Sequence, residues 1–177
     1  MKKLLSYLSL ALLASSCFKL DSPPDFPITS EGYRPIYANA DEIDKVVITT
    51  PQPLKSPGKI YIKDQFLFVN ELGKGVHIFD NKDPKSPKKI AFLQIPSNVD
   101  IAIRGDILYA DNLKDLISIN ISKPSEAKLV HRLKDVFESQ DYPPVTNVRF
   151  ECVDSNKGVV IGWEKVLNVD YTLKCYR

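Results

Sequence analysis

Two histidines and one oxygen-rich turn are the first places to look for metal binding or catalysis in this chain. His77 and His131 lie in apolar runs typical of β-strands, without cysteine or carboxylate at metal-ligand spacing, so ordinary strand histidines are expected. Asp80, Asn81 and Asp83 crowd oxygens into one turn, but that turn lacks the glycine and the distal glutamate of a calcium loop. Side-chain hydrogen bonds to backbone amides within the turn explain this composition. We predict no metal site and no cofactor.

Motifs for nucleophilic or cofactor chemistry are missing from the sequence. The chain contains no Gly-x-Ser-x-Gly, phosphate-binding loop, dinucleotide fingerprint or His-Glu-x-x-His pattern. Trp163, Tyr171 and Tyr176 would suit either an exposed binding surface or a strand core, and both interpretations stay open. We assign no catalytic residue, and the expectation is that the protein is not an enzyme.

Cys17 stands in a context that predicts covalent modification. A basic head at Met1–Lys3, an apolar run at Leu4–Leu13 and small residues from Ala14 to Ser16 form a secretory signal, and the run is too short to span a bilayer. A cysteine directly after such residues resembles a bacterial lipobox, which implies that residues 1–16 are removed and that the Cys17 thiol carries diacylglycerol. Two or three acyl chains would then hold the protein on a membrane. The alternative is an accidental cysteine at an ordinary cleavage site.

The lipid anchor and the charge balance together define the expected location and partners. Phe18, and not aspartate, follows the cysteine, which under the enterobacterial sorting rule favours the outer membrane over the inner membrane. Removing Lys2 and Lys3 with the signal leaves 22 basic against 22 acidic residues. A neutral chain has no long-range field to attract nucleic acid. The expected partners are a membrane, reached through the lipid, and a protein or glycan that the sequence does not identify.

Cys152 and Cys175 are the remaining thiols, and export would place them where disulfides persist. A bridge between them would stabilise an incomplete sheet. Two buried free thiols, or a partner cysteine in further sequence, are the alternatives.

A proline-rich segment follows the predicted lipid site. Seven prolines between Phe18 and Pro57 resist helix and favour extended chain. Inside it, the β-branched run Lys45–Thr50 predicts one strand. We therefore expect residues 17–57 to form a tether with one embedded strand.

An internal repeat dominates the rest of the chain. Ile60–Asn70 matches the apolar pattern of Ile101–Asp111 at an offset of 41, and Gly75–Asp80 matches Asp115–Asn120 at an offset of 40. Each unit holds four short strands in about 40 residues, the period of a β-propeller blade. A third, partial unit begins near Val148.

The residues of this repeat resemble the LVIVD-repeat family of bacterial surface β-propellers, which is named for an aliphatic strand ending in aspartate before a proline-containing turn. The best match is Gly75–Asp80 with the turn that ends at Pro87, and Leu116–Pro124 is a weaker copy with Asn120 in the aspartate position. The resemblance covers roughly residues 45–165. It implies a propeller fold and a lipid-anchored location, but no reaction and no catalytic residues.

The fold expected is therefore all-β: a partial β-propeller of four-stranded antiparallel blades over residues 58–95 and 99–133, with most of a third over 148–177. Phe66–Val69, Val76–Asp80 and Ile90–Leu93 should be neighbours, as should their counterparts in the second unit. Neighbouring blades on both faces would explain why Phe66–Val69 is continuously apolar. A closed propeller needs at least four blades, so we expect an open sheet edge and self-association through it.

Three functions remain open at this point. The first is a lipid-anchored binding or scaffold module, which suits a repeat fold without catalytic residues. The second is a truncated, inert fragment of a longer propeller. The third, which no residue supports, is an enzyme whose catalytic blades are absent.

Overall fold

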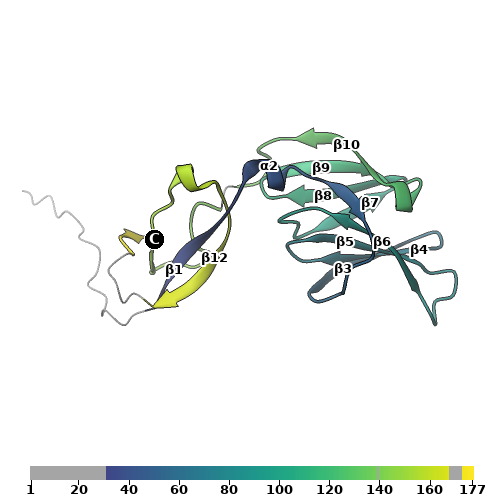
Figure 1. Cartoon of the computed structure of the whole chain (residues 1–177), viewed down its shortest axis with the longest axis horizontal. Helices are drawn as coiled ribbons and strands as arrows, with labels where there is room; N and C mark the ends of the chain where they lie inside the picture. Colours follow the sequence, from purple (N-terminus) through teal and green to yellow (C-terminus); the bar gives the residue numbers. More distant parts are fainter. Residues whose placement is uncertain (1–30, 139, 168–172) are drawn as a thin grey trace, which may run out of the picture.

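The computed structural model describes residues 31–138, 140–167 and 173–177, and these residues form three β-sheets (Figure 1). Cys17 and the predicted signal lie outside the described residues. The strands are β1 (Glu31–Ala38), β2 (Val47–Thr49), β3 (Pro57–Lys63), β4 (Phe66–Glu71), β5 (Gly75–Asp80), β6 (Lys88–Gln94), β7 (Ile101–Arg104), β8 (Ile107–Asn112), β9 (Asp115–Asn120), β10 (Lys128–Leu133), β11 (Arg149–Phe150), β12 (Val159–Leu167) and β13 (Cys175–Tyr176). The helices are one turn each: α2 (Ala40–Ile43), η1 (Pro124–Glu126) and η2 (Ser155–Lys157).

Strands β3 to β6 form an antiparallel meander in chain order, which we call unit 1, and β7 to β10 form a second meander, unit 2. This is the strand order that the sequence predicts. The predicted strand at Lys45–Thr50 is also present, as β2, and it pairs with the outer edge of β6. Unit 1 therefore belongs to a five-stranded sheet, whereas unit 2 is a four-stranded sheet that ends at β10.

The two units match in register as well as in sequence. Ile60 pairs with Val69 and, 41 residues later, Ile101 pairs with Ala110. The outer strand of each unit has a bulge at the same place, where Ile90 is the extra residue in unit 1 and Val130 is the extra residue in unit 2. The hairpin turns also correspond, because positive φ angles occur at Asp64 and Gly105, and again at Gly73 and Leu113. The repeat is thus one of backbone geometry, not only of apolar pattern.

The hydrophobic core lies between the two units and is built from one face of each. Unit 1 contributes residues such as Phe68, Ile78 and Leu93, and unit 2 contributes residues such as Leu108, Ile117 and Ile119, none of them more than 1% exposed. Removing apolar surface from water contributes about 25 cal/mol per Å², so burial of this shared face is the main interaction that holds the two units together.

The opposite face of unit 1 is covered by residues 50–56, which we call the strap. The strap runs from β2 to β3, and its Lys55 and Ser56 amides bond to Glu71 while Lys89 Nζ bonds to the carbonyl of Gln52 at 2.9 Å. The sequence predicted a neighbouring blade on each face of Phe66–Val69. In the structure, a unit covers one face and the chain's own proline-rich segment crosses the other.

Strand β1 is the main departure from the predicted organisation. Residues 17–57 were expected to hold a single strand, but Glu31–Ala38 pairs along its whole length with β12 in antiparallel register. On its other side β1 pairs with β11 in parallel, which gives the order β12-β1-β11-β13. We call this the terminal sheet. The prediction that the strands of residues 148–177 follow one another in sequence order is therefore wrong, because the N-terminal strand β1 lies between β12 and β11. Figure 1 shows β1 beside β12.

Among the residues that the structure describes, none of the three sheets closes on itself. The helices of that part of the chain are all too short to cross a membrane.

Candidate functional site

A buried glutamate–histidine pair lies beneath the strap in unit 1. Glu71 ends β4 and His77 lies in β5, and the turn between these strands brings the Glu71 carboxylate within 3.0 Å of His77 Nε2. Both side chains are almost fully buried, with 2% of Glu71 and none of His77 exposed. The imidazole packs against Phe92, at 4.8 Å between ring centroids. Among the described residues, Nδ1 of His77 finds no hydrogen-bond partner.

The Glu71 carboxylate is also the anchor of the strap. The Lys55 amide donates to both carboxylate oxygens, at 3.1 and 3.0 Å, and the Ser56 amide donates to Oε1 at 2.7 Å. Burial alone would raise the pKa of Glu71, but the donors from Lys55, His77 and Ser56 outweigh burial and lower it. The carboxylate is therefore charged at neutral pH, and N–H donors surround it. This geometry suits holding a segment of chain in place.

A depression of about 570 Å³ opens beside this pair, between the strap and the ends of β4 and β6. Its wall combines Glu71 with two lysines, Lys55 and Lys74, and with the ring of Phe92. Since the backbone amides and His77 occupy both Glu71 oxygens, the depression is left with the two lysines, the neutral polar residues Thr49, Gln52 and Gln94, and apolar surface.

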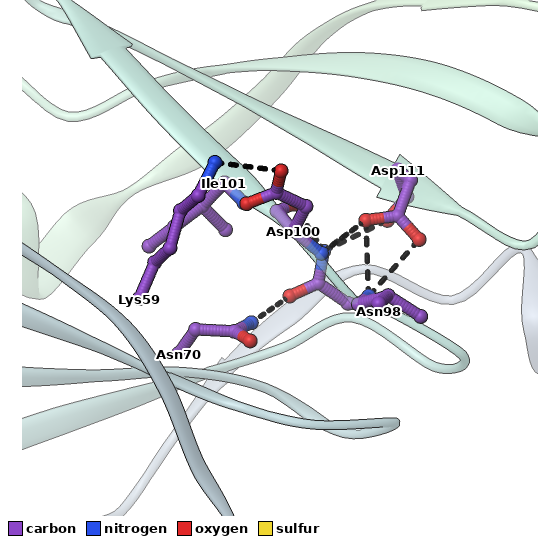
Figure 2. A network of polar contacts seen from close by, with 7 residues as sticks. Lys59, Asn70, Asn98, Asp100, Ile101 and Asp111 are labelled. Carbon is purple, nitrogen blue, oxygen red and sulfur yellow. Dashed lines mark hydrogen bonds and ion pairs between the residues drawn. The ribbon is translucent and has the colours of Figure 1, made fainter.

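A second polar network joins unit 1 to unit 2 (Figure 2). Asn98, fully buried in the link between the units, accepts a hydrogen bond from Asn70 of β4 and donates to the Asp111 carboxylate of β8 at 2.9 Å. The Asp111 carboxylate also accepts the backbone amides of Val99 and Asp100, at 3.0 and 2.6 Å. Each unit thus uses one carboxylate, at the end of its second strand, to hold the chain that enters its first strand: Glu71 in unit 1 and Asp111 in unit 2.

Charged pairs complete this junction at the inner strands. Lys59 of β3 contacts Asp100 at 2.7 Å and Lys63 contacts Asp106 at 3.0 Å, so both ends of β3 are tied to unit 2. Burial raises the pKa of Asp111, and the amides of Asp100 and Val99 offset only part of that effect. The side-chain amides of Asn70 and Asn98 therefore contribute most to fixing how the two units join, because exposed ion pairs such as Lys59 with Asp100 contribute only about 0–1 kcal/mol to stability.

The aspartates of the predicted turn bond to backbone amides, and His131 lies in a strand. Asp80 Oδ1 accepts the Lys82 amide and Asp83 Oδ1 accepts the Lys85 amide, both at 3.1 Å, which are the side-chain-to-backbone bonds that such turns use. His131 is exposed on β10. Within residues 31–138, 140–167 and 173–177, no three His, Cys, Asp or Glu side chains gather in a way that could hold a metal ion.

The remaining candidate residues lie in or near the terminal sheet. Cys152 and Cys175 are joined by a disulfide with 5.1 Å between their Cα atoms. Trp163 is partly buried and packs edge-on against Phe150. Its indole N–H donates to the carbonyl of Gln140 at 2.9 Å. Tyr176 donates to Asn147. Tyr171 lies outside the described residues.

The sequence interpretation missed the pairing of Glu71 with His77. The sequence does hold one indication of it. Both residues flank a tight turn between two apolar strands, so a hairpin brings their side chains to the same end of the sheet. It also missed the three buried asparagines Asn70, Asn98 and Asn112, whose partners are mostly backbone groups of other segments.

None of three comparisons, with protein-family models, with curated proteins and with solved structures, finds a match to this chain.

Proposed function

We propose that the protein is a membrane-anchored bacterial lipoprotein of the LVIVD-repeat type, acting as a non-catalytic binding or scaffold module on the cell envelope. Units 1 and 2 would be consecutive blades of a partial propeller, and Cys17 would carry the lipid. The observation that supports this best is the repeat itself. The two meanders share strand order, register and bulge position, as blades of one propeller do.

The arrangement of carboxylates favours binding over catalysis. Glu71, which is buried, and Asp111, which is half-buried, are both engaged with backbone amides that fix the chain. A general base must instead reach a proton on a substrate. The surfaces left for a ligand are the strand edges, the outer face of unit 2 and the depression beside the strap.

Metabolic labelling with a palmitate analogue tests the lipid anchor. We expect the wild-type chain to incorporate label and to fractionate with the outer membrane, because Phe18 follows the cysteine. The Cys17→Ser variant should lose the label and accumulate as uncleaved precursor. The matched control is Cys152→Ser, which removes a different thiol and should keep the label. Label on the Cys17→Ser variant would contradict the lipoprotein assignment.

A further inference from the structure

The repeat allows the two faces of each unit to be compared position by position. We call the face of unit 1 that enters the core, with Phe68, its front face, and the face of unit 2 that enters the core, with Ile101, its back face. At the offset of 41, the residue of unit 2 equivalent to Phe68 is Tyr109, and the residue of unit 1 equivalent to Ile101 is Ile60. Neither of these equivalents belongs to the core between the units. The core therefore joins the front of one unit to the back of the next, which is a head-to-tail contact.

Such a contact leaves one front face and one back face without a neighbouring unit among the described residues. Phe68 is 0% exposed, whereas Tyr109 is 36% exposed on the front face of unit 2. Ile101 is 2% exposed, whereas Ile60 and Ile62 are 61% and 68% exposed on the back face of unit 1. Equivalent positions are thus buried where a second unit covers them and exposed where none does.

Other segments of the chain cover these two faces only in part. The strap crosses the back face of unit 1 at β5 and β6, where His77 and Phe92 are buried, and it leaves the side chains of β3 on that face exposed. On the front face of unit 2, a hollow of about 390 Å³ lies between Ala102, Tyr109 and Phe137. Blades that radiate from a common axis are closest at their inner strands. The uncovered parts of the two faces, on β3 and β7, are therefore the parts that a neighbouring unit would contact.

The charges along the inner strands suit a repetition of the same contact. Lys59 of β3 contacts Asp100, and these residues occupy equivalent positions in the two units. If the front of unit 2 met the back of another unit 1, Asp100 would again lie beside a Lys59, so the signs stay opposite. At the position of Lys63, which pairs with unit 2, unit 2 carries Arg104, and the facing turn of another unit 1 carries Asp64. Such exposed pairs orient a contact more than they strengthen it.

We propose that a second copy of this chain supplies the missing neighbour on both faces. The front of unit 2 in each copy packs on the back of unit 1 in the other, so that two chains form one ring of four units. Head-to-tail contacts close into rings where the rotation between neighbours allows it, and four is the smallest blade number usual for a propeller. This proposal rests on the assignment of the units as blades made above. It does not depend on the lipid anchor, which palmitate labelling tests separately.

Sedimentation equilibrium of the full chain in density-matched detergent tests the ring, over about 1–50 μM protein. We expect a reversible equilibrium between one and two copies that does not proceed to larger assemblies. A monomer at every concentration would overturn the proposal. A series of trimers and longer species would also overturn it, because an open head-to-tail chain, and not a ring, would then be present.

Three aspartate substitutions at exposed positions locate the contact. Ile62→Asp on the back face of unit 1 and Ala102→Asp on the front face of unit 2 should each raise the dimer dissociation constant by about tenfold or more, because each buries a charge at both junctions. Val130→Asp lies on β10 at the open sheet edge, where the side chain is 54% exposed, and should leave the constant unchanged. Dissociation by Val130→Asp, or by only one of the other two, would contradict face-to-face closure. Far-UV circular dichroism at the lowest concentration should show that all three variants keep the sheet content of the wild type.

Discussion

Replacing Glu71 by glutamine perturbs the point that holds the strap on unit 1. The substitution keeps the shape of the side chain, but it removes the charge and turns one acceptor into a donor that faces backbone N–H groups. Three N–H groups now point at this carboxylate, those of Lys55, Ser56 and His77. Hydrogen bonds to a charged group contribute about 1.5–3 kcal/mol each, and unpaired buried donors cost a similar amount. Because the strap itself is exposed, its amides can partly turn to water, so we expect a total loss of about 2–4 kcal/mol.

The pH dependence of this loss has a definite sign. The pKa of Glu71 in the folded chain is below its ordinary value of 4.5. Its contribution to stability is therefore complete above that value and is lost as pH falls through the folded pKa. The difference between wild type and Glu71→Gln should be largest at neutral pH and should shrink in acid. Comparing the two proteins also cancels the opposite contribution of Asp111, whose pKa is raised by burial.

Urea denaturation followed by far-UV circular dichroism measures the global effect, and hydrogen exchange at the Lys55 and Ser56 amides measures the local one. Both amides should be protected in wild type and should exchange faster in Glu71→Gln. Glu126→Gln is the control, since Glu126 is 64% exposed and lies 3.8 Å from Lys123, and it should change stability by less than about 0.5 kcal/mol. An unchanged urea midpoint together with unchanged exchange at Lys55 and Ser56 would refute the role given to Glu71.

Three further substitutions test other parts of the structure. Asn98→Ala should lower the free energy of unfolding, measured in urea, by about 2–3 kcal/mol, because it leaves polar groups of both units unpaired. The control Lys59→Ala should lower it by less than about 1 kcal/mol. Equal losses would mean that the exposed ion pair stabilises the junction as much as the buried amide does. Leu113→Gly should raise the midpoint of thermal unfolding by an amount equivalent to about 0.5–1 kcal/mol. The reason is that φ is 61° at Leu113, a conformation that favours glycine, and that the equivalent residue of unit 1 is Gly73. A lower midpoint would show that packing of the leucine side chain outweighs the backbone strain. Cys152→Ser should destabilise the terminal sheet by about 3 kcal/mol, because the disulfide spans a sequence separation of 23 residues. Trp163 fluorescence should report this loss. Protection of the β8 amides against hydrogen exchange should stay as in wild type.

The sequence predicted the repeat units well because their contacts are local. Each hairpin joins neighbouring strands, and the apolar alternation of Ile101 to Ala110 determines which face is buried. The strand at Val47–Thr49 was also predictable, although its partner was not. Strand β1 was missed because nothing near Glu31–Ala38 distinguishes it from extended tether: it contains Pro35, and its partner β12 lies more than 100 residues away.

The candidate site was harder to predict than the fold. A buried carboxylate leaves a sequence signal only if its partner is another side chain at a characteristic spacing. Glu71 bonds to backbone amides of the strap, and any residue type can supply those. The same holds for Asn112, whose amide donates to the carbonyls of Ile43 and Pro96.

The position of β1 also has a consequence for the order in which the protein folds. Units 1 and 2 are built from hairpins of low contact order, so they can fold as soon as they emerge during synthesis or export. β1 emerges before both of them, but its partners β11 and β12 lie more than 100 residues further along the chain. It must therefore wait as an unpaired strand, on the same side of the chain as the predicted membrane anchor, until residues 149–167 have emerged. Folding should accordingly show a fast phase for the two units and a slow phase in which the terminal sheet forms around β1.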